Sequence, residues 1–197
     1  AEETEGGWCG KMSMRRKVFL VLMILWMAGI FAFSSRSGDE STEDSYFAGT
    51  MVGDLFVPGF DEWSMERQQE FAEMIDHPVR KTAHAAEYAV LGLLAAGVCI
   101  PAAERHRGEN ELTGKDGSGR YVNGGAAKIR RELLIPWGIA ALYAATDEFH
   151  QLFVPGRSGQ ISDVILDSAG ALAGLLILAL VRKIMSRRQN NIEKCAK

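Results

Sequence analysis

The chain has 197 residues, a formal net charge of -3 at pH 7 and a hydrophobic content of 47%, and these averages alone would fit an ordinary soluble domain. The charge is close to balanced, and no basic patch is interleaved with aromatic residues, which argues against a nucleic-acid partner. The hydrophobic residues are gathered into long uninterrupted runs, however, and this distribution indicates a membrane protein instead.

Four apolar segments predict an all-α fold, an integral membrane four-helix bundle. A helix needs about twenty mainly apolar residues to cross a bilayer. The expected spans are about 18–35, 83–103, 133–153 and 163–181. The first contains sixteen apolar residues, so a cleaved signal peptide with a site at Ala32–Ser34 is the alternative there. In either case the chain from residue 35 starts outside.

Two short amphipathic helices are expected in the loop between the first two spans. One would begin with Asp61 as N-cap and end at His77-Pro78, because its apolar residues recur at helical spacing. The other would cover Tyr46–Phe60 and end at Pro58-Gly59. Helices of this kind lie on the membrane interface.

The segment 104–132 is rich in glycine and charged residues and predicts a flexible cytoplasmic linker. The cysteines Cys9, Cys99 and Cys195 all fall on or near the cytoplasmic side, so we expect no disulfide. Their spacing also fits no zinc site.

Basic residues set the expected orientation. Seventeen Lys and Arg precede the first span, lie in 104–132 or follow the fourth span, and only five lie in the remaining loops. The positive-inside rule then places both termini in the cytoplasm. The predicted organisation is a cytoplasmic tail at 1–17, a transmembrane domain at 18–184 and a basic cytoplasmic tail at 185–197, in a multi-pass protein of the cell membrane.

Polar residues gather where the expected spans meet the outer face. They are Ser34, Ser35, Lys81, His84, Glu87, Asp147, Glu148, His150, Gln151, Arg157, Asp163 and Asp167. Ionisable groups in membrane segments cost free energy and by default indicate a functional site. Two alternatives stay open: boundary residues that mark the water interface, and a structural polar network that ties the helices together.

The residue types suggest phosphate chemistry. His150 and His84 are candidate catalytic bases, and Asp147, Glu87 and Asp163 are candidates for orienting them. Arg157 and Lys81 would hold a phosphate. The remaining candidate substrate-binding residues are Glu148, Gln151, Ser34, Ser35 and Asp167.

A metal site is a variant of this hypothesis. His84-x-x-Glu87 and Asp147-x-x-His150 each place two ligand types on one helical face. The nearby cations Lys81 and Arg157 would oppose a metal ion, so no cofactor is expected.

The fourth span carries a small-residue motif, Gly170 and Gly174, on the face that also carries Asp163 and Asp167. Such a motif lets another helix approach closely, within one chain or in a dimer. The oligomeric state therefore stays open.

Three segments together resemble the VanZ-like family of bacterial membrane proteins: FSSRSG at 33–38, RKTAHAAEYAVLG at 80–92 and TDEFHQLFVPGRSGQISDVILDSAGALAG at 146–174. The resemblance implies a bundle of about four transmembrane helices. It also implies a possible link to resistance against the glycopeptide teicoplanin, since some members carry one. Asp167 stands where the family pattern leads us to expect Asn.

Three functions are compatible with these features. The first is an enzyme that hydrolyses or transfers the headgroup of a phospholipid or polyprenyl phosphate in the outer leaflet. The second is a non-catalytic module that binds a lipid headgroup, a cell-wall precursor or an antibiotic. The third, an ion or proton pathway, is disfavoured because the inner halves of the spans are apolar.

Overall fold

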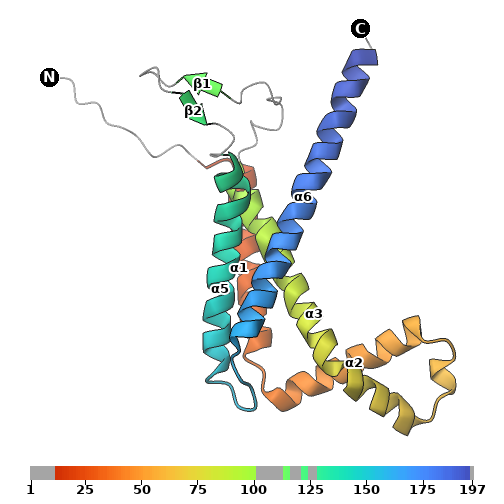
Figure 1. Ribbon diagram of the computed structural model, residues 1–197. Coiled ribbons are helices and arrows are strands. Elements are labelled where there is room, and N and C mark those ends of the chain that lie inside the picture. Colours follow the sequence, from red (N-terminus) through yellow and green to blue (C-terminus); the bar gives the residue numbers. More distant parts are fainter. Residues whose placement is uncertain (1–11, 101–112, 116–120, 124–127, 196–197) are drawn as a thin grey trace.

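The computed structural model describes residues 12–100, 113–115, 121–123 and 128–195 (Figure 1). Its helices are α1 (Met14–Ser34), α2 (Gly38–Phe56), the 3-10 helix η1 (Phe60–Glu62), α3 (Met65–Cys99), the π-helix η3 (Arg130–Leu134), α5 (Ile135–Gln151) and α6 (Ile161–Cys195). The strands β1 (Thr113–Lys115) and β2 (Tyr121–Asn123) form one antiparallel pair. The described chain is therefore helical apart from this small hairpin.

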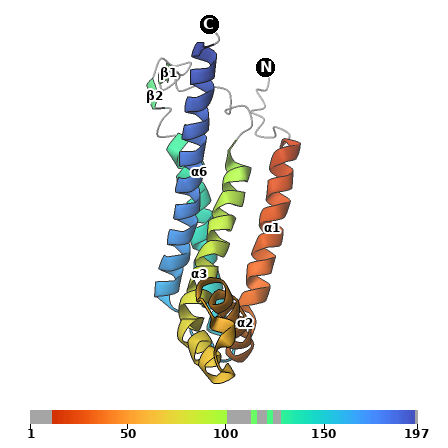
Figure 2. The same ribbon diagram turned by 90° about the vertical axis from the view of Figure 1, so that its right-hand side faces the viewer.

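Helix α3 lies at the centre of the molecule and packs against α1, α5 and α6 (Figures 1 and 2). All four helices contribute to the main core, which contains Tyr88 and Leu91 of α3, Ile30 of α1, Ala140 and Ala144 of α5, and Ala171 of α6. The start of α1 and the end of α6 lie at one end of the molecule (Figure 2). The end of α1, the end of α5 and the start of α6 lie at the other, which we call the polar end.

Three described helices are long and apolar enough to cross a membrane: α1, α3 and α6. Large apolar side chains such as Leu25 and Ile177 are exposed on their outer surfaces, as expected for contact with lipid. The α-helical part of the third expected span, α5, has only 17 residues. By length and composition the described chain thus supports three spanning helices where the sequence predicts four.

The expected helix end at His77-Pro78 is wrong. Helix α3 continues through Pro78 and runs for 35 residues. Proline lacks a backbone N–H and normally interrupts a helix, but the contacts of α3 with both α2 and α6 hold the chain helical on either side. The start is also displaced: Ser64, and not Asp61, is the N-cap, and its side chain accepts a hydrogen bond from Arg67 N.

Helix α2 and the first half of α3 form a hairpin that projects sideways from the polar end (Figure 1). Small residues let the two helices approach, since a Cβ on Gly49 would lie 3.1 Å from Ala72 Cα. The expected helix over Tyr46–Phe60 is present in longer form, and it ends at Phe56, before Pro58-Gly59. Gly59 has a φ of 73°, a left-handed conformation that glycine adopts without strain.

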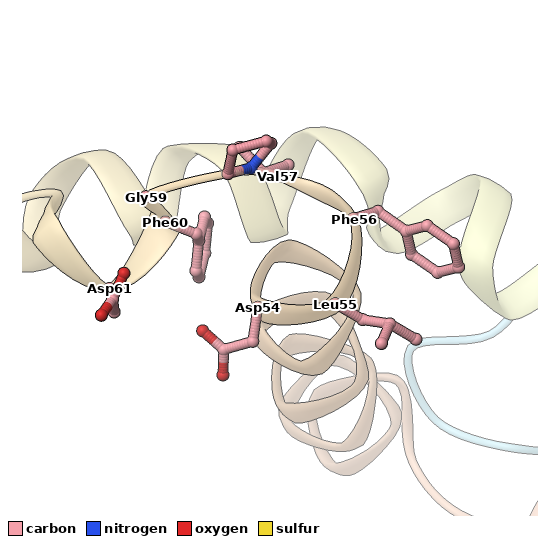
Figure 3. A pocket seen from close by; sticks show the side chains of 8 residues that line it. Asp54, Leu55, Phe56, Val57, Gly59, Phe60 and Asp61 are labelled. Atoms are coloured by element: carbon pink, nitrogen blue, oxygen red, sulfur yellow. The ribbon is translucent and has the colours of Figure 1, made fainter.

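A hollow lies at the turn between α2 and η1 (Figure 3). It is lined by residues 54–61, including Leu55, Phe56 and Phe60. None of the twelve residues proposed from the sequence as a site belongs to its lining.

The glycine motif of α6 is used within the chain. A Cβ on Gly170 would collide with the Ala85 carbonyl of α3, and one on Gly174 would lie 2.9 Å from the Ala89 carbonyl. The two backbones therefore approach each other directly, as the small residues predict. This contact turns the face of α6 that carries Asp163 and Asp167 towards α3.

The segment 104–132, predicted to be a flexible linker, contains the hairpin β1–β2 and the start of a helix. The π-helix η3 directly precedes Pro136, the second residue of α5. Because the proline ring clashes with the carbonyl four residues earlier, the turn there widens. Of the cysteines, Cys99 is a free, partly buried thiol, and the Cys9 and Cys195 side chains lie outside the described part.

Candidate polar site

The polar end brings together side chains from α1, α3, α5, the turn 152–160 and α6. The two site residues furthest apart in the sequence, Ser34 and Asp167, are 133 positions apart. The packing of α3 against its neighbours sets the positions of these elements. The candidate residues fall into three groups: an α3–α6 group, an α1–α5 group and the turn.

The α3–α6 group contains one ion pair and one contact between a histidine and a carboxylate. Lys81 Nζ donates to Asp163 Oδ1 at 2.6 Å and joins the two helices. One turn further along α3, His84 Nδ1 lies 3.3 Å from Glu87 Oε2. Residues three apart share a helical face, which is why the His84-x-x-Glu87 spacing produces this contact.

The α1–α5 group contains two serine contacts. Gln151 Nε2 donates to Ser34 Oγ at 3.1 Å, and both residues are buried. The neighbouring Ser35 is exposed, and its Oγ lies 3.1 Å from His150 Nε2. The His150 ring also packs on Phe31, with ring centroids 4.5 Å apart. The two adjacent serines therefore have different surroundings: Ser34 is internal, and Ser35 faces the surface.

Several buried polar atoms between these groups have no hydrogen-bond partner in the described chain. They are Asp167 Oδ1, the Tyr88 hydroxyl and both carboxylate oxygens of Asp147, which interact with the Ser34 and Gln151 side chains without a hydrogen bond of normal geometry. The three residues that carry these atoms are at most 3% exposed. Asp147 also interacts electrostatically with both His84 and His150. Unsatisfied buried polar atoms are costly, and a concentration of them favours a functional site over simple packing.

The turn after α5 is built around Glu148 and Arg157. Glu148 Oε2 accepts a hydrogen bond from Gln160 N at 2.9 Å, and Gly156 supplies a φ of 74°. The turn lies so close to α5 that a Cβ on Gly159 would collide with the Glu148 carbonyl. These contacts fix the loop that carries Arg157.

Arg157 is partly buried, and its Nε has no acceptor in the described chain. It lies within electrostatic range of Asp147, Glu148 and Glu87. Burial, and then the like charge of Arg80, lower the pKa of the Arg157 guanidinium. An arginine nevertheless stays charged at neutral pH, so the turn holds a cation with an unused donor beside several carboxylates.

A sequence model of the VanZ/LLP1 family matches residues 19–182. The chain belongs to the VanZ/LLP1 family. The match runs from α1 into α6 and includes every candidate site residue, which confirms the resemblance noted in the sequence. No curated protein and no solved structure matches the chain.

In this VanZ/LLP1 fold the candidate residues share one end of the molecule, but not all pair as expected. Asp163 contacts Lys81 and Ser162, and not a histidine. Glu87 is the only expected orienting carboxylate that contacts a histidine in the described chain. Asp147 and His150, one turn apart on α5, interact through space without a described hydrogen bond. No three His, Cys, Asp or Glu side chains among the described residues are arranged to hold a metal ion.

Two features of the site were missed from the sequence. Tyr88 lies in the stripe of Lys81 and His84, and this spacing was the available signal for its position among the acids. The Ser35–His150 contact joins residues 115 positions apart. No local sequence pattern predicts this contact, because it depends on the relative orientation of α1 and α5.

Proposed function

We propose that this VanZ/LLP1 family protein binds a phosphate-linked lipid at its polar end and hydrolyses or transfers the headgroup. The observation that carries the proposal is the partly buried Arg157, which offers an unused Nε donor beside ionisable residues from α3 and α5. Arginine is well suited to phosphate because its planar fork donates two parallel hydrogen bonds.

The proposal includes four membrane crossings with both termini in the cytoplasm. The helical chain that contains η3 and α5 is continuous from residue 128 to 151, which gives a length of about 36 Å. Charged residues lie in its first turns, at Lys128, Arg130, Arg131 and Glu132, and at its polar end, at Asp147 and Glu148, and the stretch from Leu133 to Ala145 between them has none. The polar end then faces outwards, and the ends rich in Lys and Arg face the cytoplasm.

The lipid orientation follows from this topology. An acyl or prenyl tail would lie against the exposed apolar surfaces of the helices, and the headgroup would reach Arg157 and His150. His150 is the base that we propose, because its ring nitrogen contacts a residue at the surface, whereas the His84 Nδ1 contact is with Glu87 on the same helix. The Nε2 atom of His150 lies next to the exposed Ser35 and so borders the surface from which a headgroup would approach.

A non-catalytic binding module is the second candidate, and one observation favours it. Lys81, Glu148 and Gln151 are each engaged in a contact that joins helices or fixes the turn. A rigid cluster of this kind could hold a lipid headgroup, a cell-wall precursor or a glycopeptide without any reaction. A role in teicoplanin resistance would be compatible with either candidate.

Comparing the membrane lipids of cells with and without the protein, by mass spectrometry, tests the proposal. An enzyme should create or remove a defined headgroup species. An unchanged lipid profile together with altered glycopeptide binding to the cells would instead support the binding module.

Two substitutions test whether the change in headgroup species depends on the polar site. His150→Gln should reduce the headgroup change at least a hundredfold, since glutamine is not a base at neutral pH. Arg157→Lys should reduce it about tenfold or more, because the charge stays but the two-point phosphate contact is lost. Arg187→Lys, an exposed substitution near the end of α6, is the matched control and should have no effect. Full activity in both site variants would refute the assignment.

A further inference from the structure

We infer that Ser35 is the nucleophile of the polar site, with His150 as its general base, so that catalysis passes through a covalent phosphoserine intermediate. The inference rests on the proposed function and deepens it. It gives Ser35, a substrate-binding candidate in the sequence analysis, the role of nucleophile and pairs it with His150, a candidate base there.

The geometry of the pair is the first argument. Ser35 Oγ and His150 Nε2 are 3.1 Å apart, which is within the range required for proton transfer between a nucleophile and its base. The two residues come from α1 and α5, so the contact is built by tertiary packing and is not a local helix feature. Phe31 packs on the imidazole ring and holds it in this orientation.

The contrast between the adjacent serines is the second argument. Ser34 is fully buried and accepts a hydrogen bond from Gln151, so a substrate cannot reach it without disrupting the core. Ser35 is exposed and directly follows the last residue of α1. A lipid headgroup approaching the polar end would therefore meet the Ser35 hydroxyl and not that of Ser34.

His150 lies where two helices end. It is in the last turn of α5, and its contact with Ser35 places it beside the C-terminus of α1. Asp147 lies within electrostatic range of both His150 and Arg157. The base and the phosphate-binding cation thus both interact with this carboxylate.

In the structure the Ser35 hydroxyl also donates to the Phe31 carbonyl at 2.6 Å. This is the ordinary bond that a serine makes to the carbonyl four residues earlier. Rotation about the Cβ–Oγ bond redirects the proton to His150 Nε2 without moving the oxygen. In this conformation the Ser35 proton is bonded to the Phe31 carbonyl and cannot pass to His150. The pair becomes reactive when a bound substrate breaks this hydrogen bond and the hydroxyl turns towards His150.

The reaction balances in two steps. First, Ser35 Oγ bonds to phosphorus, its proton moves to His150 Nε2, the bond from phosphorus to the leaving alcohol breaks, and His150 returns the proton to that alcohol. Second, water or an acceptor hydroxyl loses a proton to His150, its oxygen bonds to phosphorus, and the Ser35 Oγ–phosphorus bond breaks as Oγ takes back the proton. Water gives hydrolysis, and an acceptor hydroxyl gives transfer.

A long-chain alkyl fluorophosphonate tests the inference on the full-length protein in native membranes. The probe forms an Oγ–phosphorus bond with an activated serine and releases fluoride. Peptide mass spectrometry should locate the adduct at Ser35. Ser35→Ala should abolish labelling, and His150→Gln should slow it about 10²–10⁴-fold. Ser13→Ala, which removes a hydroxyl at the opposite end of α1, is the control and should label normally.

The outcomes separate this inference from the proposed function. Absence of an adduct at Ser35 in the natural protein would overturn the nucleophile assignment, and so would an unchanged labelling rate in His150→Gln. If Ser35→Ala still produced the headgroup change in cells, the inference would fail and the proposed function would stand. Membrane abundance and thermal stability, measured for each variant, distinguish loss of chemistry from loss of folding.

Discussion

At the scale of single residues, the close approach of α3 and α6 depends on glycine, which has no side chain, at positions 170 and 174. The Ala85 carbonyl occupies the space that a side chain on Gly170 would need. Gly170→Val should therefore push the helices apart and lower the free energy of unfolding by about 1–3 kcal/mol, the usual cost of overpacking. Thermal unfolding in detergent measures this loss.

Gly29→Ala is the matched control for that measurement. A Cβ at Gly29, in the middle of α1, would meet no atom within 4 Å, and alanine favours the helix more than glycine does. Its stability should be unchanged or slightly higher. Equal stabilities of the two variants would show that α3 and α6 do not meet at Gly170.

Tyr88 provides a second test at this scale. Its ring fills the core, but its hydroxyl is buried without a partner in the described chain. Tyr88→Phe should therefore leave the free energy of unfolding within about 1 kcal/mol of the natural protein, whereas Tyr88→Ala should lower it by about 3–5 kcal/mol, as for other large aromatic side chains. A large loss in Tyr88→Phe, measured by thermal unfolding, would mean that the hydroxyl has a partner, such as a bound water.

At the scale of helices, α2 presents an apolar stripe away from the rest of the protein. Phe47, Met51 and Leu55 are four residues apart and are 57–75% exposed, while Gly49 and Gly53 face α3 and η1. The sequence predicts that this helix lies on the membrane interface, and in that position the stripe would contact lipid. Met51→Gln/Leu55→Gln should then increase the exposure of α2 amides to hydrogen exchange in lipid nanodiscs.

The control for the stripe is Asp54→Asn, which changes a polar residue beside Phe47 and Met51 and removes no apolar side chain, and it should leave the exchange rates unaltered. If the α2 amides of the Gln variant exchanged at the same rates as those of the natural protein, α2 would not contact the bilayer.

The behaviour of α3 shows where local sequence rules stop. Pro78 follows His77 in a pattern that predicts a helix end, yet the helix continues because packing on both sides outweighs the lost hydrogen bond. The polar end was predictable, since charged residues interrupting long apolar runs are conspicuous. The pairing within it was not: Lys81 with Asp163, and Ser35 with His150, depend on helix rotations that only tertiary packing sets.

At the scale of the whole molecule, the structure places the polar end and the last turns of α6 at opposite ends (Figure 1). A membrane around the apolar helices would separate them, with the polar end outside according to the charge distribution. Gln69 in α3 and Ser186 in α6 are exposed, and in the proposed orientation they would lie on opposite sides of that membrane. They allow the proposed orientation to be tested without disturbing the core.

The test uses a variant in which Cys9, Cys99 and Cys195 are replaced by serine or alanine. A single cysteine introduced by Gln69→Cys should react with a membrane-impermeant maleimide on intact cells, and one introduced by Ser186→Cys should react only after the membrane is opened. Both side chains are solvent-exposed, so a difference in labelling reports sidedness and not burial. Labelling of Ser186→Cys on intact cells, with Gln69→Cys protected, would invert the orientation. Arg157 and His150 would then face the cytoplasm, and the substrate would have to be a lipid of the inner leaflet.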